Sequence, residues 1–230
     1  MTMKTPGPEL TDAASGLSYR VMQPHPPAPT RCLLLLHGVG SNELSVAGLA
    51  EGVPDDTLVV LVRAPRALGV GQFAWFEVSF TASGPRIVAE QADQSREQLI
   101  RLLAELHRQH GVSASQTVIA GFSQGGIMSA SVALTSPESV AGFGVLSGRI
   151  LPEIEPQLAS NQRLAQLNGF VGHGEHDSKL PVDWAHRSHA WLEKLGVRHT
   201  LTLYPIAHTV SPQMHADFVQ WLSTVWGTGD

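Results

Sequence analysis

Short aliphatic runs, each long enough for one strand and too short for a helix, recur along this chain of 230 residues. Continuously apolar runs of this length are typical of strands covered on both faces, as in parallel sheets. Helical patterns lie between them, and such alternation predicts a mostly parallel, twisted sheet with helices on both faces. The expected strands cover residues 17–22, 31–36, 57–62, 117–120, 141–146, 167–171 and 199–204.

Apolar residues follow the helical period most clearly in the segments 99–106, 182–192 and 214–225. Gly196 is expected to end the second of these helices, since many helices end at a glycine. Ser211 is suited to cap the third helix, and the proline that follows it fits a first helical turn.

The composition is that of a globular protein, with 43% hydrophobic residues and a net charge of −5. The negative charge argues against nucleic-acid partners. No aliphatic stretch approaches the roughly 20 residues that would span a bilayer, so no membrane insertion is expected. Cys32, as a lone cysteine, cannot form an internal disulfide. We expect a cytoplasmic protein with a poorly ordered segment over residues 1–16 and one domain over residues 17–230. The sequence leaves the oligomeric state open, and a homodimer is one of the possible states.

The most informative motif is Gly121-Phe122-Ser123-Gln124-Gly125, which follows an expected strand and precedes a helical pattern. In this context G-x-S-x-G is typical of a nucleophilic serine on a strained turn. The two glycines carry no Cβ atom that could collide there. The helix that follows would direct N–H groups and its positive dipole end toward Ser123. The alternative is an ordinary glycine-rich turn in which Ser123 caps the helix.

A nucleophilic serine needs a base and an orienting acid, which in this arrangement follow it in the order acid, then histidine. Asp177 lies in the loop after the strand expected at 167–171, and His208 lies in the loop after the last expected strand. We therefore predict that Ser123, Asp177 and His208 form a catalytic triad. Glu175 is a rival for the acid, and ordinary loop or capping roles are the alternative for each partner.

The oxyanion of the transition state also needs hydrogen-bond donors. The backbone N–H of Gln124 is expected to supply one, and that of Val39, in a glycine-flanked turn, the other. His173 and His176 could join Asp177 in a partial metal site, but they lie on a loop and no helical H-E-x-x-H pattern is present. No metal and no other cofactor is expected.

Taken together, the motifs resemble the α/β-hydrolase superfamily, and more narrowly its phospholipase/carboxylesterase branch, which includes the acyl-protein thioesterases. The matching segments lie in family order at residues 35–40, 63–65, 73–77, 121–126, 172–177 and 207–208. The resemblance implies the same triad and the same oxyanion donors. It also implies that Trp75 and Phe76 lie near the acyl-binding side. Ala207 stands where the family often has glycine, and Lys179-Leu180 where it usually has a hydrophobic pair.

From these observations we predict a serine hydrolase that cleaves small-molecule carboxylic esters of short to medium acyl chains through an acyl-enzyme. The segment between residues 62 and 117 leaves no room for a large cap domain, which predicts an open site. The alternatives are a thioesterase or lysophospholipase acting on longer acyl chains, a dienelactone-type hydrolase, which usually has a cysteine nucleophile, and a non-catalytic binding module on the same fold.

Overall fold

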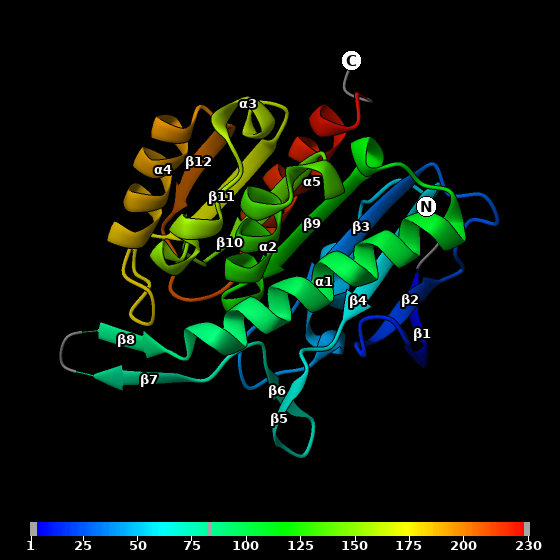
Figure 1. The fold of residues 1–230 in the computed structure, drawn as a ribbon, viewed down its shortest axis with the longest axis horizontal. Coiled ribbons are helices and arrows are strands. Elements are labelled where there is room, and N and C mark those ends of the chain that lie inside the picture. Colours follow the sequence, from blue (N-terminus) through cyan, green and yellow to red (C-terminus); the bar gives the residue numbers. More distant parts are fainter. Residues whose placement is uncertain (1–3, 82–83, 228–230) are drawn as a thin grey trace.

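The centre of the protein is a sheet of eight strands, seen in a computed structural model that describes residues 4–81 and 84–227 (Figure 1). The strand order is β1-β2-β4-β3-β9-β10-β11-β12. All neighbours from β4 to β12 pair in parallel, whereas β1 and β2 are antiparallel additions at one edge. The bounds are Thr5–Thr11 (β1), Ser18–Gln23 (β2), Arg31–Leu36 (β3), Thr57–Val62 (β4), Thr117–Phe122 (β9), Gly142–Leu146 (β10), Asn168–Gly174 (β11) and Arg198–Tyr204 (β12).

Helices cover both faces of this sheet, which confirms the predicted fold class. One face packs against α1 (Ala89–His110), α2 (Gln124–Thr135) and α4 (Asp183–Leu195), and α1 crosses that face in Figure 1. The other face packs against α5 (Pro212–Val225) and the 3-10 helix η1 (Glu43–Ala50). Successive strand residues point to opposite faces, so strands buried on both sides must be apolar throughout.

Strand β3 illustrates this division of the core. Leu34 and Leu36 belong to the cluster under α1 and α2, whereas Leu33 and Leu35 belong to the cluster under η1 and α5. All four side chains are completely buried. The alternation explains why an unbroken aliphatic run forms a strand here.

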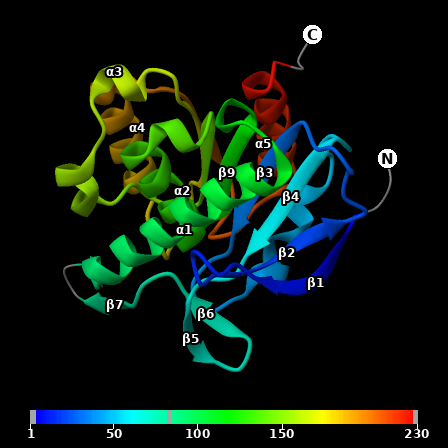
Figure 2. The ribbon, with the colours of Figure 1, turned by 45° about the vertical axis from the view of Figure 1, so that its right-hand side comes forward.

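The segment between β4 and α1, expected as a loop, forms two small antiparallel hairpins. The first pairs β5 (Arg66–Gly69) with β6 (Gln72–Ala74), and the second pairs β7 (Val78–Thr81) with β8 (Gly84–Ile87). Figure 2 shows β5 and β6 below the central sheet and β7 beside the start of α1. The hairpins therefore extend the protein beside one end of the sheet.

Residues 1–16 were expected to be poorly ordered; in the structure residues 5–16 form strand β1 and the turn after it, and residues 1–3 lie outside the described residues. Strand β1 pairs with β2, and its Glu9 accepts hydrogen bonds from Arg20 and Arg63. Strand β1 contains two prolines, which an edge strand tolerates because one side of its backbone stays unpaired. The turn that follows is held by Asp12, whose carboxylate accepts from the N–H and hydroxyl of Ser15.

Two strands in the parallel part of the sheet continue past their expected carboxyl ends, and this matters for the site. Strand β9 continues to Phe122, directly before the motif serine, and β11 continues to Gly174, three residues before Asp177. The carboxyl ends of β9, β11 and β12 meet at the same edge of the sheet, which is where parallel sheets form their sites. Among the helices that the structure describes, none is long and apolar enough to cross a membrane.

Candidate active site

Ser123 occupies the turn between β9 and α2, in a backbone conformation with φ 54° and ψ −117°. Positive φ values are uncommon for residues other than glycine and persist only where the surroundings enforce them. The Ser123 N–H donates to the carbonyl of Leu146 at 2.8 Å, and its carbonyl accepts from Ile127 at 3.1 Å. The strained turn is thus anchored to β10 on one side and to the first turn of α2 on the other.

The two glycines of the motif make this turn sterically possible. A Cβ atom on Gly121 would lie 2.5 Å from the carbonyl carbon of Gly125. A Cβ atom on Gly125 would lie 2.1 Å from the carbonyl oxygen of Leu36, at the end of β3. Both contacts are with backbone, which cannot move aside as a flexible side chain could. The expected steric need for glycine is therefore present at both positions.

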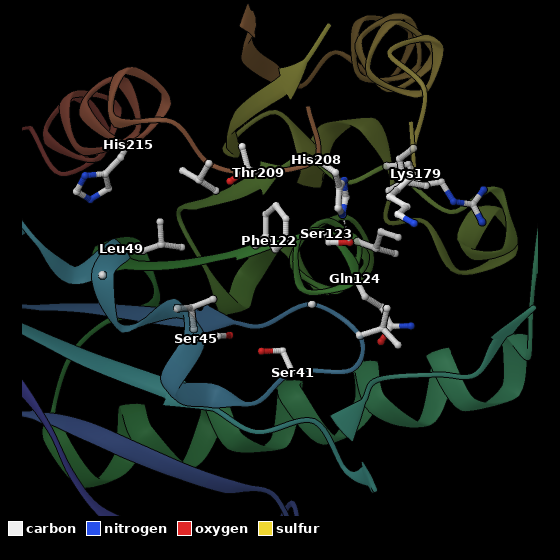
Figure 3. Close-up of a pocket in the computed structure, with 18 of the residues that line it drawn as sticks. Ser41, Ser45, Leu49, Phe122, Ser123, Gln124, Lys179, His208, Thr209 and His215 are labelled. Carbon is white, nitrogen blue, oxygen red and sulfur yellow. Dashed lines mark hydrogen bonds between the residues drawn. The ribbon is translucent and has the colours of Figure 1, made fainter. Parts of the chain in front are cut away.

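The structure brings Ser123, His208 and Asp177 together from three separate loops. Figure 3 shows the first two of these residues side by side. The Nε2 atom of His208 lies 2.9 Å from the hydroxyl oxygen of Ser123. Its Nδ1 atom lies 2.6 Å from Oδ2 of Asp177. With a proton on Nδ1 donated to the carboxylate, Nε2 is free to accept the serine proton. The His208 ring also packs on Phe122, with the ring centroids 4.9 Å apart.

Asp177 is fixed by its second carboxylate oxygen. Oδ1 accepts from the backbone N–H groups of Lys179 and Leu180, both at 2.8 Å. The side chain of Asp177 is completely buried, whereas Glu175 is exposed and its side chain makes no hydrogen bond or ion pair with the described residues. Of the two candidate acids, Asp177 is the one that lies in contact with the histidine.

The two expected oxyanion donors flank Ser123. Gln124 is the first residue of α2, so its N–H has no intrahelical partner. Val39 follows Gly38, on which a Cβ atom would lie only 3.3 Å from the Cβ atom of Ser123. The Val39 N–H makes no hydrogen bond with any of the described residues. Both groups therefore remain available next to the serine.

The loop that carries Val39 is held by His37. Its Nδ1–H donates to the carbonyl of Gly38 at 2.7 Å, and its Nε2 accepts from the N–H of Ala64 at 3.0 Å. Complete burial lowers the pKa of His37, which favours the neutral ring that this pattern requires, although the bond to Gly38 acts in the opposite direction.

Trp75 and Phe76 differ in their position relative to the cavity at the site. Phe76 lines the cavity at the site, but Trp75 is fully buried and is not among the described residues that line it. The expected contact of Trp75 with substrate therefore lacks support. The backbone of both residues binds the Gln124 side chain instead: Oε1 accepts from Trp75 N–H and Nε2 donates to the Phe76 carbonyl, each at 2.7 Å.

A cavity of about 850 Å³ opens on Ser123 and His208 and extends to both sides of them. Figure 3 shows Leu49 and His215 on one side of Ser123 and Lys179 on the other. Several lining residues were not found from the sequence, because they come from η1, from the second hairpin and from the turn after β10, where no motif marks them. They include Ser45, Leu49, Val78, Ile87 and Arg149.

Among the described residues there is neither a metal site nor a reactive cysteine beside the serine site. No group of three or more histidine, cysteine, aspartate or glutamate residues is placed to hold a metal ion within residues 4–81 and 84–227. Cys32 is buried in β3, and burial raises the pKa of its thiol to about 12. The thiol therefore stays protonated and is a poor nucleophile at neutral pH.

Comparison with known proteins gives consistent matches over most of the chain. Residues 18–226 match the family model for Phospholipase/Carboxylesterase. The acyl-protein thioesterase 1 of Kluyveromyces lactis is 27% identical over 206 residues, covering 83% of this chain and 90% of that protein. The acyl-protein thioesterase 1 of Emericella nidulans is 23% identical over 218 residues, covering 85% and 90%.

Solved structures show the same fold. The Bacillus cereus carboxylesterase has a TM-score of 0.78 at 22% identity and covers 91% of this chain and 94% of its own. The esterase PE8 has a TM-score of 0.77 at 25% identity and covers 97% of this chain and 100% of its own.

Proposed function

Since this chain belongs to the phospholipase/carboxylesterase family of α/β-hydrolases, and is thus a hydrolase of esters or thioesters, we propose that it cleaves carboxylic esters through a covalent acyl-Ser123 intermediate. The observation that carries the proposal is the continuous chain of contacts from Ser123 Oγ to His208 at 2.9 Å and from His208 to Asp177 at 2.6 Å. This is the geometry that a serine nucleophile needs.

In the first half of the proposed reaction, Ser123 Oγ attacks the ester carbonyl while His208 Nε2 takes its proton. Asp177 stabilises the imidazolium that forms. The oxyanion accepts hydrogen bonds from the N–H groups of Val39 and Gln124, at the positive end of α2. As the tetrahedral intermediate collapses, the C–O bond breaks and His208 returns the proton to the leaving alcohol.

In the second half, a water molecule attacks the acyl group on Ser123. His208 removes a proton from this water and returns it to the serine oxygen, so the carboxylic acid leaves and the enzyme is restored. Every group used belongs to this chain, and the mechanism requires no cofactor. The same steps serve a thioester, whose leaving group is a thiol.

Labelling with a fluorophosphonate probe tests the nucleophile. We expect stoichiometric labelling of the wild-type protein at Ser123 and none in Ser123→Ala. A non-catalytic binding module on this fold would leave the wild type unlabelled and inactive on all esters. Labelling at another residue would overturn the assignment of Ser123.

A series of p-nitrophenyl esters, with thioesters of the same acyl groups alongside, tests the substrate class. Each acyl CH₂ that is buried adds about 0.8 kcal/mol, but an open site buries only the first few. We propose that kcat/KM peaks at short to medium chains and falls for long ones, and that triglyceride emulsions are poor substrates. The second candidate function, a thioesterase or lysophospholipase for long acyl chains, is favoured by the two fungal relatives. A rise of kcat/KM up to palmitoyl groups, largest for thioesters, would support that candidate instead.

A further inference from the structure

Arg149 is a buried cation without a counter-ion on the wall of the cavity that contains Ser123. Arg149 is only 4% exposed and lines the cavity. It makes no hydrogen bond or ion pair with any of the described residues. Burial lowers the pKa of its guanidinium, and Glu153 only partly opposes this effect. A buried charge is costly unless something pairs with it, so this position calls for an explanation.

The backbone around Arg149 is rigidly placed beside the catalytic turn. Ser147 N–H donates to the carbonyl of Gly172 at 2.8 Å, and Ile150 N–H donates to the hydroxyl of Ser188 at 3.2 Å. A Cβ atom on Gly148 would lie 3.0 Å from the carbonyl oxygen of Ser123. The residue before Arg149 therefore packs directly on the turn that carries the serine.

Stacking on an aromatic ring accounts for only part of this arrangement. The Arg149 guanidinium lies over the Trp184 ring at 4.4 Å from its centroid. Arg187 also lies over this ring, at 4.9 Å, yet Arg187 is exposed and does not line the cavity. Arg187 thus stacks on Trp184 while it stays exposed to water. Stacking alone therefore does not explain why Arg149 is buried in the wall of the active-site cavity.

A second cation lines the same cavity. Lys179 lines the cavity, is exposed and makes no ion pair with the described residues. Its backbone N–H binds Oδ1 of Asp177, which fixes its place next to the proposed triad. Figure 3 shows Lys179 on the side of Ser123 away from Leu49 and His215. The acidic residue that lines the cavity, Glu51, belongs to the segment after η1, like Leu49.

We propose that Arg149 and Lys179 form a subsite for an anionic group of the substrate, a carboxylate or a phosphate, next to the ester that Ser123 attacks. This inference rests on the proposed function and narrows its substrate class from esters in general to esters of anionic molecules. A guanidinium binds such groups through two parallel N–H bonds, and stacking on Trp184 holds its plane. Lys179 adds a second charge at the rim that attracts the anion.

Pairs of esters that differ only in charge test the subsite. Mono-p-nitrophenyl glutarate and p-nitrophenyl valerate place the charge on the acyl side. On the leaving-group side, 4-acetoxybenzoate is compared with its methyl ester, and 4-acetoxyphenyl phosphate replaces carboxylate by phosphate. For each pair the readout is the ratio of kcat/KM, anionic over neutral, compared between variants, since the intrinsic reactivity of each ester cancels.

We expect Arg149→Gln to lower this ratio about tenfold to hundredfold for at least one pair, as loss of a charge-assisted hydrogen bond would. Lys179→Gln is expected to lower it less, and Arg149→Lys to keep part of it. The matched control is Arg187→Gln, which removes the other cation over Trp184 and leaves the ratio unchanged. The pair that responds identifies the side of the ester and the kind of anion.

Equal ratios in the wild type and Arg149→Gln for every pair would overturn the proposal and leave Arg149 with a packing role only. Failure of the proposed function is a different result: no hydrolysis of the neutral esters and no fluorophosphonate labelling. Calorimetric titration with glutarate and with inorganic phosphate gives a readout that needs no turnover. Binding to the wild type that is lost in Arg149→Gln would support the subsite, and the absence of binding together with equal ratios would refute it.

Discussion

Two buried carboxylates, Glu43 and Asp177, have similar burial but different partners. Glu43 is 1% exposed and Asp177 is 5% exposed. Glu43 accepts from Arg20 Nε at 2.8 Å and from Arg63 Nε and Nη2 at 2.7 Å each. Asp177 accepts from two backbone amides and from one imidazole, that of His208.

The difference lies in whether the partner can lose its proton. Guanidinium groups stay charged throughout the accessible pH range, so Glu43 is permanently paired. Burial acts to raise the pKa of Glu43, but the hydrogen bonds from Arg63 and Arg20 outweigh it and lower that pKa to about 2. An imidazole can be neutral or charged, so Asp177 can stabilise a charge that appears only during a reaction. The first arrangement suits stability and the second suits catalysis.

The largest effect should come from the serine that completes the Asp177 arrangement. We expect Ser123→Ala to lower kcat by about 10⁴-fold or more, because residues that act as a unit fail together. The melting temperature should stay close to that of the wild type, since the change removes one hydroxyl. Steady-state kinetics and thermal unfolding on the same preparation measure both quantities. Retention of substantial activity would exclude the serine mechanism.

Asp177→Asn should keep the fold and lose most of the activity. The amide oxygen can still accept from Lys179 and Leu180, but the amide NH₂ then faces His208 Nδ1 and favours the wrong tautomer of the ring. We expect kcat to fall by about 10³- to 10⁴-fold. Glu175→Gln is the control and should behave like the wild type. If Glu175→Gln were inactive and Asp177→Asn active, the two acids would have to exchange roles.

Glu43→Gln should lower the stability of the fold and keep most of the activity, the opposite of what is expected for Asp177→Asn. Removing this charge leaves two arginines with fewer partners, Arg20 and Arg63, although Glu9 still binds both. Breaking a buried pair can cost about 3–5 kcal/mol, and we expect about 2–3 here because both arginines are partly exposed and remain paired. Urea unfolding measures the loss. Activity per folded molecule should change far less than in Asp177→Asn. A loss of activity as large as that of Asp177→Asn would mean that Glu43 does not have a purely structural role.

The same pairing predicts how stability depends on pH. The pKa of Glu43 is about 2 in the folded state, below the roughly 4.3 of an unperturbed glutamate. The unfolded state therefore binds more protons between these values, so the contribution of Glu43 is present above about pH 4.3 and is lost as pH falls toward 2. Urea unfolding at several pH values should show this slope in the wild type and a smaller slope in Glu43→Gln. Identical slopes would mean that the arginines do not lower the pKa.

The proposed catalytic residues could be found from the sequence because local rules mark them. The strand, the two glycines and the following helix identify Ser123, and the carboxyl ends of later strands identify Asp177 and His208. The same reasoning gave the central strands of the sheet, whose aliphatic runs are continuous.

What could not be predicted depends on contacts between distant residues. Glu43 meets partners 20 and 23 positions away in the sequence, and no motif announces such a pairing. Arg149 lies one turn beyond a strand, as many surface arginines do, and only the packed structure shows that it is buried. The resemblance implied a place near the acyl-binding side for Trp75, but whether its ring is exposed there depends on what packs around it, and it is buried. The edge strand β1 was missed because its pairing partner, not its own sequence, makes it a strand.

Gln124 is a third buried polar side chain, but it is neutral and both of its hydrogen-bond partners are backbone groups. Its amide joins α2 to the N–H of Trp75 and the carbonyl of Phe76. Gln124→Ala leaves these two buried groups without their partner, which should lower the free energy of unfolding by about 1–3 kcal/mol. The proposed oxyanion donor is the backbone N–H of Gln124, which alanine retains, so kcat should fall much less than in Ser123→Ala. Unfolding and kinetics at a temperature where the variant is folded separate the two effects. A loss of kcat as deep as that of Ser123→Ala would mean that the amide side chain itself takes part in the reaction.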